Sequence, residues 1–121
     1  MSTKKFIKDF YKSEALINRE LLEPYLHPEF QMEWNGHSGL LKMNKQDLLE
    51  YTQELEKTYI RFKARMSHIL VDKDLVSVKF SLFVRIVENP REELYLTDFM
   101  TIWEIKDDKL YRCYQVSRVV K

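Results

Sequence analysis

Hydrophobic residues recur along this chain with two different periods. In the first part they follow helical spacing, as at Phe6, Ile7, Phe10, Tyr11, Ile17 and Leu21. From about residue 61 onward, apolar and polar residues alternate over long stretches, as expected for strands with two different faces. Because helices come first and strands follow, the pattern predicts an α+β fold rather than alternating βαβ units.

Capping residues set the expected limits of three helices. Thr3 can cap the first helix, and Asn18 can cap a shorter second one. Asn44, followed three residues later by Asp47, favours the start of a third helix, which we expect to end near Lys57.

The alternating segments predict consecutive strands joined by short turns, which is typical of an antiparallel meander. We expect a short strand at 29–34 and four long strands at 61–71, 75–87, 94–105 and 111–120. Strands of this length twist and curl strongly. The expected structure is therefore a curved antiparallel sheet, made of four long strands plus a short N-terminal strand, wrapped around the N-terminal helices.

Two titratable residues interrupt the apolar face that this alternation assigns to the concave side. With unbroken alternation, His68 enters that face from the first long strand, and Asp98 enters it between Leu96 and Met100. A lone buried carboxylate is costly. Asp98 therefore lines a pocket, pairs with an Arg or His for structural reasons, or is turned to solvent by a β-bulge.

The pocket alternative makes Asp98 and His68 the candidate catalytic residues. An acid with a raised pKa in an apolar pocket can abstract a proton next to a carbonyl, and a His–Asp pair could instead activate water. Tyr114 or Arg118 could stabilise the negative charge that develops. The full set of expected ligand-binding residues is Trp34, Tyr51, Met66, Met100, Tyr114 and Arg118. In the alternative without catalysis, Asp98 is a buried structural partner of His68 or Arg118.

Aromatic side chains also fall on the opposite face of the predicted sheet. They are Phe83, Tyr95, Phe99 and Trp103. Aromatic residues on the outside of a sheet usually indicate that another surface covers them. We therefore expect a homodimer through this face, the alternative being scattered exposed aromatics.

Composition narrows the class of protein. The 121 residues are expected to form one domain, and the 20 basic and 19 acidic residues give no electrostatic case for binding nucleic acid or an anionic membrane. With Cys113 as the one cysteine and no long apolar segment, we expect a cytoplasmic protein that neither spans a membrane nor forms an internal disulfide. The two glycines cannot form a phosphate-binding loop and the three histidines lack metal-ligand spacing, so neither cofactor nor metal is expected.

Four segments together resemble the SnoaL-like branch of the nuclear transport factor 2-like superfamily, over nearly the whole chain. They are "LLEPYLHPEF", "QMEW", "NKQDLLEYTQEL" and "DFMTIWEIKDDKLYRCYQVSR". The resemblance implies a cone with an internal pocket at its open end, and dimerisation through the outer sheet face is common in that superfamily. Its members include polyketide cyclases, ketosteroid isomerase, scytalone dehydratase, epoxide hydrolases and binding proteins without activity.

The resemblance implies a function only in outline, because one fold hosts many activities. It implies a small, partly apolar ligand in the cone pocket. Isomerase, cyclase or dehydratase chemistry at Asp98 and His68 is one alternative, and a binding or dimeric interaction module without catalysis is the other.

Overall fold

The computed structural model describes residues 2–120. Its helices are α1 (Thr3–Lys12), α2 (Arg19–Leu22) and α3 (Lys45–Leu55), with 3-10 turns at Ala15–Ile17 and Glu23–Tyr25. Its strands are β1 (Leu26–Gly36), β2 (Gly39–Asn44), β3 (Tyr59–Asp72), β4 (Leu75–Ile86), β5 (Asn89–Lys106) and β6 (Lys109–Val119).

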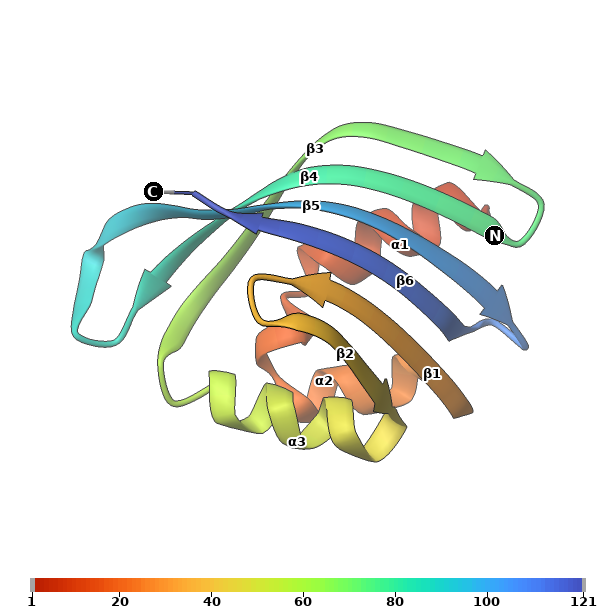
Figure 1. Cartoon of the computed structure of the whole chain (residues 1–121), viewed down its shortest axis with the longest axis horizontal. Helices are drawn as coiled ribbons and strands as arrows, with labels where there is room; N and C mark the ends of the chain where they lie inside the picture. Colours follow the sequence, from red (N-terminus) through yellow and green to blue (C-terminus); the bar gives the residue numbers. More distant parts are fainter. Residues whose placement is uncertain (1, 121) are drawn as a thin grey trace.

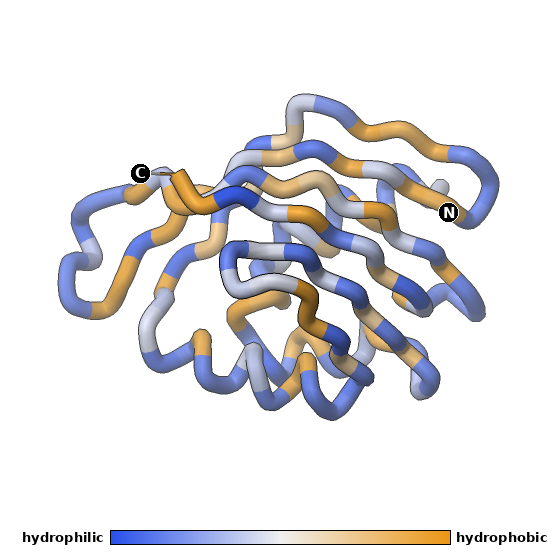
Figure 2. The backbone as a smooth tube through the Cα atoms, viewed as in Figure 1, coloured by the Kyte–Doolittle hydropathy of each residue, from blue (hydrophilic) through white to orange (hydrophobic). Residues whose placement is uncertain are grey.

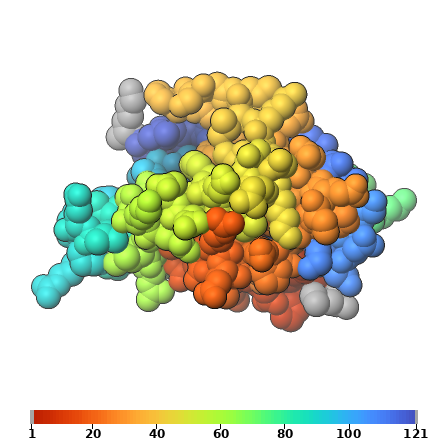
Figure 3. Space-filling view, turned by 90° about the horizontal axis from the view of Figure 1, so that it is seen from below, coloured from red at the N-terminus to blue at the C-terminus, as the bar shows by residue number. Residues whose placement is uncertain are grey.

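The strands form one curved six-stranded sheet in the order β2-β1-β6-β5-β4-β3. Neighbouring strands are antiparallel except β1 and β6, which are parallel. The sheet arches over the helices, which lie on its concave side (Figure 1). Seen from below, the helical part covers that side while the β4–β5 hairpin projects beyond it (Figure 3). The predicted α+β class with a curved sheet around N-terminal helices is confirmed, with β2 as an additional strand where a connection was expected.

Helix starts agree closely with the capping residues in the sequence. Asn44 and Asp47 form a complete capping box at α3, with Asp47 N donating to Asn44 Oδ1 over 2.8 Å. Asn18 caps α2 through Leu21 N. At α1 the cap is Ser2 rather than Thr3, because the Ser2 hydroxyl accepts from the backbone of the third helical residue.

Trp103 on β5 lies at the centre of the core. Its indole packs edge-on against Phe10 of α1, with ring centroids 5.5 Å apart, and it donates from Nε1 to the Tyr11 hydroxyl over 2.9 Å. Phe99, two residues earlier on the same face, stacks on Phe80 of β4 at 4.9 Å. Both residues therefore face inward, and their predicted place in an outer dimer surface is wrong. Phe83 and Tyr95 do lie on the outer face, where their rings stack at 4.9 Å.

Several register shifts interrupt the alternation that Figure 2 shows along the strands, and three of them reverse parts of the predicted inner face. Each of these three leaves one extra residue: Ser67 in β3, Leu96 in β5 and Tyr111 in β6. One extra residue moves the side chains that follow it in that strand to the opposite face. On β4, which carries no extra residue at these points, the inward residues alternate strictly from Val76 to Val84.

Each bulge therefore overturns one part of the predicted concave face. The residues that unbroken alternation places inside but that lie on the outer face include His68, Asp98, Met100, Ile102, Arg112, Tyr114 and Arg118. Their places inside are taken by Thr97, Phe99, Thr101, Trp103, Cys113 and Gln115, all of which are buried. The correction is purely geometric, because the assumption of unbroken alternation fails at one residue in each of three strands.

Candidate ligand-binding site

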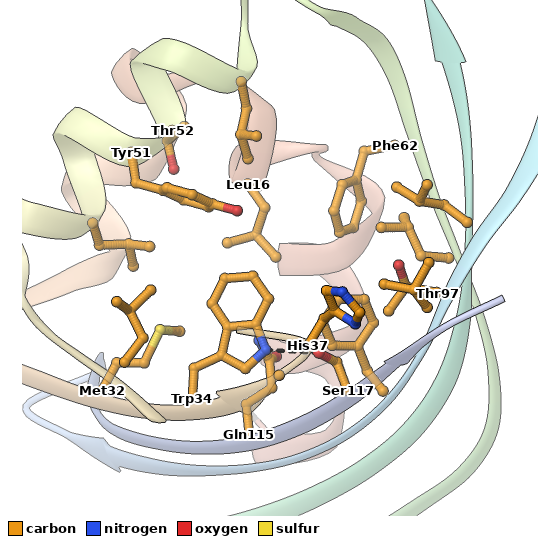
Figure 4. Close-up of a pocket in the computed structure, with 18 of the residues that line it drawn as sticks. Leu16, Met32, Trp34, His37, Tyr51, Thr52, Phe62, Thr97, Gln115 and Ser117 are labelled. Atoms are coloured by element: carbon orange, nitrogen blue, oxygen red, sulfur yellow. Dashed lines mark hydrogen bonds between the residues drawn. The ribbon is translucent and has the colours of Figure 1, made fainter. Parts of the chain in front are cut away.

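A cavity of about 550 Å³ lies between the concave face of the sheet, α3 and the β1–β2 hairpin (Figure 4). Its walls are mainly aromatic and aliphatic, including Leu16, Met32, Trp34, Tyr51, Phe62, Phe80, Phe99 and Trp103. Ligand sites of this kind bury most of a small molecule against apolar walls and orient it with a few polar groups.

The described lining of this cavity contains no Asp, Glu, Lys or Arg. Besides the indoles of Trp34 and Trp103, its hydrogen-bonding side chains are one amide, several hydroxyls and an imidazole: His37, Ser38, Tyr51, Thr52, Tyr59, Thr97, Gln115 and Ser117. A charged ligand would lose its hydration there without gaining an ionic partner. The arrangement therefore suits a neutral molecule.

The floor of the cavity contains a hydrogen bond between neighbouring parallel strands. Trp34 Nε1 on β1 donates to Ser117 Oγ on β6 over 2.8 Å (Figure 4). Gly36 leaves space for this bond, because a Cβ at that position would lie 3.1 Å from Ser117 Oγ and 3.2 Å from Trp34 Nε1. The Trp34 ring also contacts Tyr51 edge-on at 5.8 Å, which links the floor to α3.

A second polar contact lies deeper, below Trp103. Thr101 donates from Oγ1 to Gln115 Oε1 over 2.8 Å, in a buried contact between β5 and β6. Burial raises the pKa of Tyr11 above its ordinary value, while hydrogen bonds with Trp103 and Thr101 lower it by less. The phenol therefore keeps its proton near neutral pH.

The α3 wall contributes Tyr51 and Thr52. Burial, and secondarily the nearby Tyr59, raises the pKa of Tyr51, so its hydroxyl keeps its proton near neutral pH. Thr52 is fully buried, and its Oγ1 has no hydrogen-bond partner within residues 2–120. An unpaired buried hydroxyl of this kind is uncommon.

His37 lies at the mouth of the cavity, on the turn between β1 and β2. It is exposed and lines the same cavity as Thr97 and Ser117 (Figure 4). Imidazole is the side chain most often used as a general acid or base. His37 is therefore the lining residue best suited to proton transfer.

Of the eight site residues predicted from the sequence, the structure places two at the cavity. These are Trp34 and Tyr51. Met66 faces inward and packs against the core outside the cavity lining. Met100, Tyr114 and Arg118 lie on the outer face of the sheet. His68 is exposed there too, with its Nδ1 3.0 Å from Ser67 Oγ.

The Asp98 carboxylate is held on the outer face by three donors. Ser81 Oγ donates to it over 2.8 Å, Arg118 Nη2 lies 3.2 Å from Oδ2, and the Tyr95 hydroxyl also donates. The hydrogen bond from Tyr95, then that from Ser81 and last Arg118, lower the pKa of Asp98. The acid is thus kept ionised, the reverse of the raised pKa expected in a pocket. No described contact joins it to His68, and the predicted interior location of this pair is wrong.

Sequence reasoning missed the polar residues that do line the cavity. Thr52, Thr97, Gln115 and Ser117 are residue types common on any protein surface, so their chemistry gives no signal. The usable signal was positional. Thr97 shares the face of the bulky Phe99 in strict alternation, and aromatic residues of that size are the ones that fill cores.

Two further searches of the structure bear on the kind of site. Among residues 2–120, no group of three or more His, Cys, Asp or Glu side chains is placed to hold a metal ion. In the same part of the chain, no helix is both long and apolar enough to cross a membrane.

Comparison with known proteins shows the fold. No protein-family model matches the chain, and no curated protein matches its sequence. Solved structures do match. IdmH from Streptomyces antibioticus, assigned as a polyketide cyclase, aligns with a TM-score of 0.74 and 13% identity over 97% of this chain and 92% of its own. A protein from Shewanella denitrificans, assigned as a SnoaL-like polyketide cyclase, aligns with a TM-score of 0.73 and 10% identity over 95% of this chain and 89% of its own.

A protein from Catenulispora acidiphila with a ketosteroid isomerase-like fold, solved in complex with trimethylamine, aligns with a TM-score of 0.70 and 9% identity over 94% of this chain and 85% of its own. The chain therefore shares the fold of these SnoaL-like and ketosteroid isomerase-like structures, the fold that its sequence pattern indicated. Identities this low establish the fold and leave the activity to be argued from the site.

Proposed function

We propose that this protein binds a small, neutral, partly apolar molecule in the cavity between the sheet and α3. The observation that carries the proposal is a volume of about 550 Å³ with aromatic walls and no charged side chain in its described lining. Flat rings suit such walls, because the rings of Trp34, Phe80 and Phe99 offer extended apolar surfaces. The polyketide cyclases named among the similar structures support a cavity ligand of this general kind.

Both tryptophans of the chain line the cavity, which gives a direct binding test. N-phenyl-1-naphthylamine, a neutral dye that fluoresces in apolar surroundings, should bind saturably and quench emission from Trp34 and Trp103. Thr97→Phe should block binding, since the larger ring would extend from β5 into the cavity. Circular dichroism would establish that the variant is folded. Absence of saturable binding by the parent protein, or unchanged binding by folded Thr97→Phe, would count against the proposal.

A second candidate function is proton transfer of the isomerase or cyclase type on the bound molecule. The observation that favours it is that the exposed His37 and the Ser117 hydroxyl line the same cavity (Figure 4). In this scheme the imidazole would remove a proton next to a carbonyl, and the Ser117 hydroxyl would donate to the resulting enolate oxygen. His37→Gln should then abolish turnover while dye binding persists. Proton exchange next to the carbonyl can be measured by NMR in deuterated water. If the parent protein and His37→Gln catalyse this exchange at equal rates, proton transfer by His37 is excluded.

We also propose that two copies of the chain pair through the outer face of the sheet. Met100 and Val116 are 60% and 57% exposed and are direct cross-strand neighbours, as are Ile102 and Tyr114 beside them. These four residues, called the outer apolar strip below, form a continuous patch across β5 and β6. A second copy would bury this strip against its own, which is the usual arrangement in a symmetric dimer.

A further inference from the structure

Two hydrogen bonds around the cavity begin at tryptophan side chains, and this determines the direction of the contacts that follow. An indole N–H can donate but cannot accept. Trp34 and Trp103 therefore each force the oxygen beside them to be an acceptor. Each of these oxygens belongs to a hydroxyl group, whose own proton remains free to be donated elsewhere.

The first of these hydrogen bonds ends at the hydroxyl of Ser117. Its Oγ accepts from Trp34 Nε1 over 2.8 Å. Because that lone pair is engaged, the hydroxyl proton of Ser117 is free to be donated. Ser117 is half-buried and lines the cavity, so a ligand is the available acceptor.

The second tryptophan contact is buried, with Tyr11 accepting from Trp103 over 2.9 Å. Separately, the buried Thr101 side chain donates to Gln115 Oε1 over 2.8 Å. The amide oxygen is thereby occupied, and this fixes which end of the amide group points away from Thr101.

The other end of the Gln115 amide group is Nε2, which carries two N–H donors. Gln115 lines the cavity and is 8% exposed. Within residues 2–120, Thr52 Oγ1 is the one inaccessible side-chain polar atom without a partner, so Gln115 Nε2 keeps some access to solvent. Gln115 and Ser117 are two residues apart on β6 and project from the same face. The sheet side of the cavity thus presents neighbouring donors.

We infer that the cavity selects its ligand by hydrogen-bond acceptors, with Gln115 Nε2 and Ser117 Oγ as the donors that contact a carbonyl oxygen. Thr101 is a positioning residue that keeps the Gln115 amide in this orientation. The ligand class is a flat neutral molecule bearing a ketone, ester or quinone oxygen. A molecule of the same shape whose only polar group is an N–H donor would leave these donors unpaired. The inference rests on the proposed binding function and specifies its selectivity.

Three tricyclic compounds of the same outline test this selectivity: 9-fluorenone with a carbonyl acceptor, carbazole with an N–H donor, and fluorene with neither. Each is titrated against the intact protein carrying N-phenyl-1-naphthylamine, and displacement of the dye is measured. Fluorenone should bind about tenfold more tightly than carbazole or fluorene, as expected for one or two good hydrogen bonds. Gln115→Met should remove most of this advantage.

Variants of Thr101 separate positioning from simple packing. Thr101→Val leaves Gln115 Oε1 without its donor, so the amide can turn and present its oxygen to the cavity. Carbazole should then gain relative to fluorenone. Thr101→Ser keeps the hydroxyl and should retain the preference for fluorenone. A merely structural role for Thr101 would change all three affinities together and leave their order as it was.

The outcomes distinguish the inference from the function on which it rests. Binding of all three compounds with equal affinity, or preference for carbazole, would overturn the inference and leave the proposed binding function intact. An unchanged ratio of the fluorenone and carbazole affinities in folded Thr101→Val would overturn the positioning role of Thr101. If neither the dye nor any of the compounds binds, the proposed function itself fails.

Discussion

Trp34 Nε1 and Ser117 Oγ lie 2.8 Å apart, and the missing side chain of Gly36 leaves them the space to meet. Gly36→Ala would place a Cβ 3.1 Å and 3.2 Å from these two atoms, so their hydrogen bond must lengthen or break. We expect a loss of about 1 kcal/mol in the free energy of unfolding, together with altered Trp34 emission and weaker binding of N-phenyl-1-naphthylamine. Urea denaturation and fluorescence titration measure these effects.

Gly39 provides the matched control for this prediction. Its φ is +94°, a conformation that side chains rarely adopt, yet a Cβ there would meet no atom within 4 Å. Gly39→Ala should therefore cost stability through backbone strain while leaving Trp34 emission unchanged. If both variants change the emission equally, the effect of Gly36→Ala comes from the hairpin backbone rather than from the hydrogen bond.

The unpaired hydroxyl of Thr52 makes an opposite prediction for stability. Thr52→Val replaces a fully buried hydroxyl that has no partner within residues 2–120 by a methyl group of similar shape. The ligand-free protein should gain about 1 kcal/mol, because the desolvation cost of the hydroxyl disappears. Thr52→Ser keeps the hydroxyl, loses the methyl and should be less stable than the parent protein. A Thr52→Val protein that unfolds at lower urea concentration would show that the hydroxyl is hydrogen-bonded in solution.

Asp98 predicts how stability depends on pH. Hydrogen bonds from Tyr95 and Ser81, with Arg118, lower its pKa in the folded protein relative to an unfolded value of about 3.9. The ionised form is thus favoured by folding. Its contribution is present above the unfolded pKa and is lost as pH falls through the folded pKa. The stability advantage of the parent protein over Asp98→Asn should be constant from pH 7 to about pH 5 and shrink below pH 4.

Asp72→Asn serves as the control, because Asp72 is exposed and forms no ion pair among the described residues. The difference in free energy of unfolding between Asp72→Asn and the parent protein should vary little over the same pH range. An advantage over Asp98→Asn that grows in acid would mean that Asp98 has a raised pKa, as the pocket alternative required.

The sequence predicts the elements of this fold far better than the faces of its strands. Caps such as Asn44 act locally, within one turn, so they can be recognised without knowing the rest of the structure. Which face of β5 turns inward depends on whether Leu96 is paired, and that is decided by its neighbours in β4. Both faces of β5 carry apolar residues, so alternation alone could not reveal the error.

The same reasoning explains what was found and missed at the site. Trp34 lines the cavity and lies on a strand without one of the three bulges described above. His68 lies one residue after the bulge at Ser67, and Asp98 lies two residues after the bulge at Leu96. Gln115 does not follow from the alternation, because the bulge at Tyr111 moves the Gln115 side chain from the predicted outer face to the inner face of the sheet. The sequence pattern makes titratable residues such as Asp98 the candidates for a site, whereas the described cavity lining contains no Asp, Glu, Lys or Arg.

The outer apolar strip predicts the oligomeric state. If two copies pair through it, the parent protein should have the mass of a dimer in sedimentation equilibrium, and Met100→Lys should be monomeric because it buries a charge at the centre of the contact. Val87→Lys is the control, since Val87 is also about half exposed but follows β4 in the projecting hairpin. A monomeric parent protein at high concentration, or a dimeric Met100→Lys, would contradict the proposed pairing.

Cys113 predicts how tightly the centre of the sheet is closed. It is fully buried opposite Trp103, and burial raises the pKa of its thiol well above the ordinary value. The thiolate is the reactive form, so the folded protein should not react with a thiol reagent such as Ellman's reagent. In increasing urea, the reactive fraction should follow the loss of Trp103 fluorescence, because one cooperative transition exposes both residues. Rapid, complete labelling without urea would instead show that β6 separates from β5 while the rest of the protein stays folded.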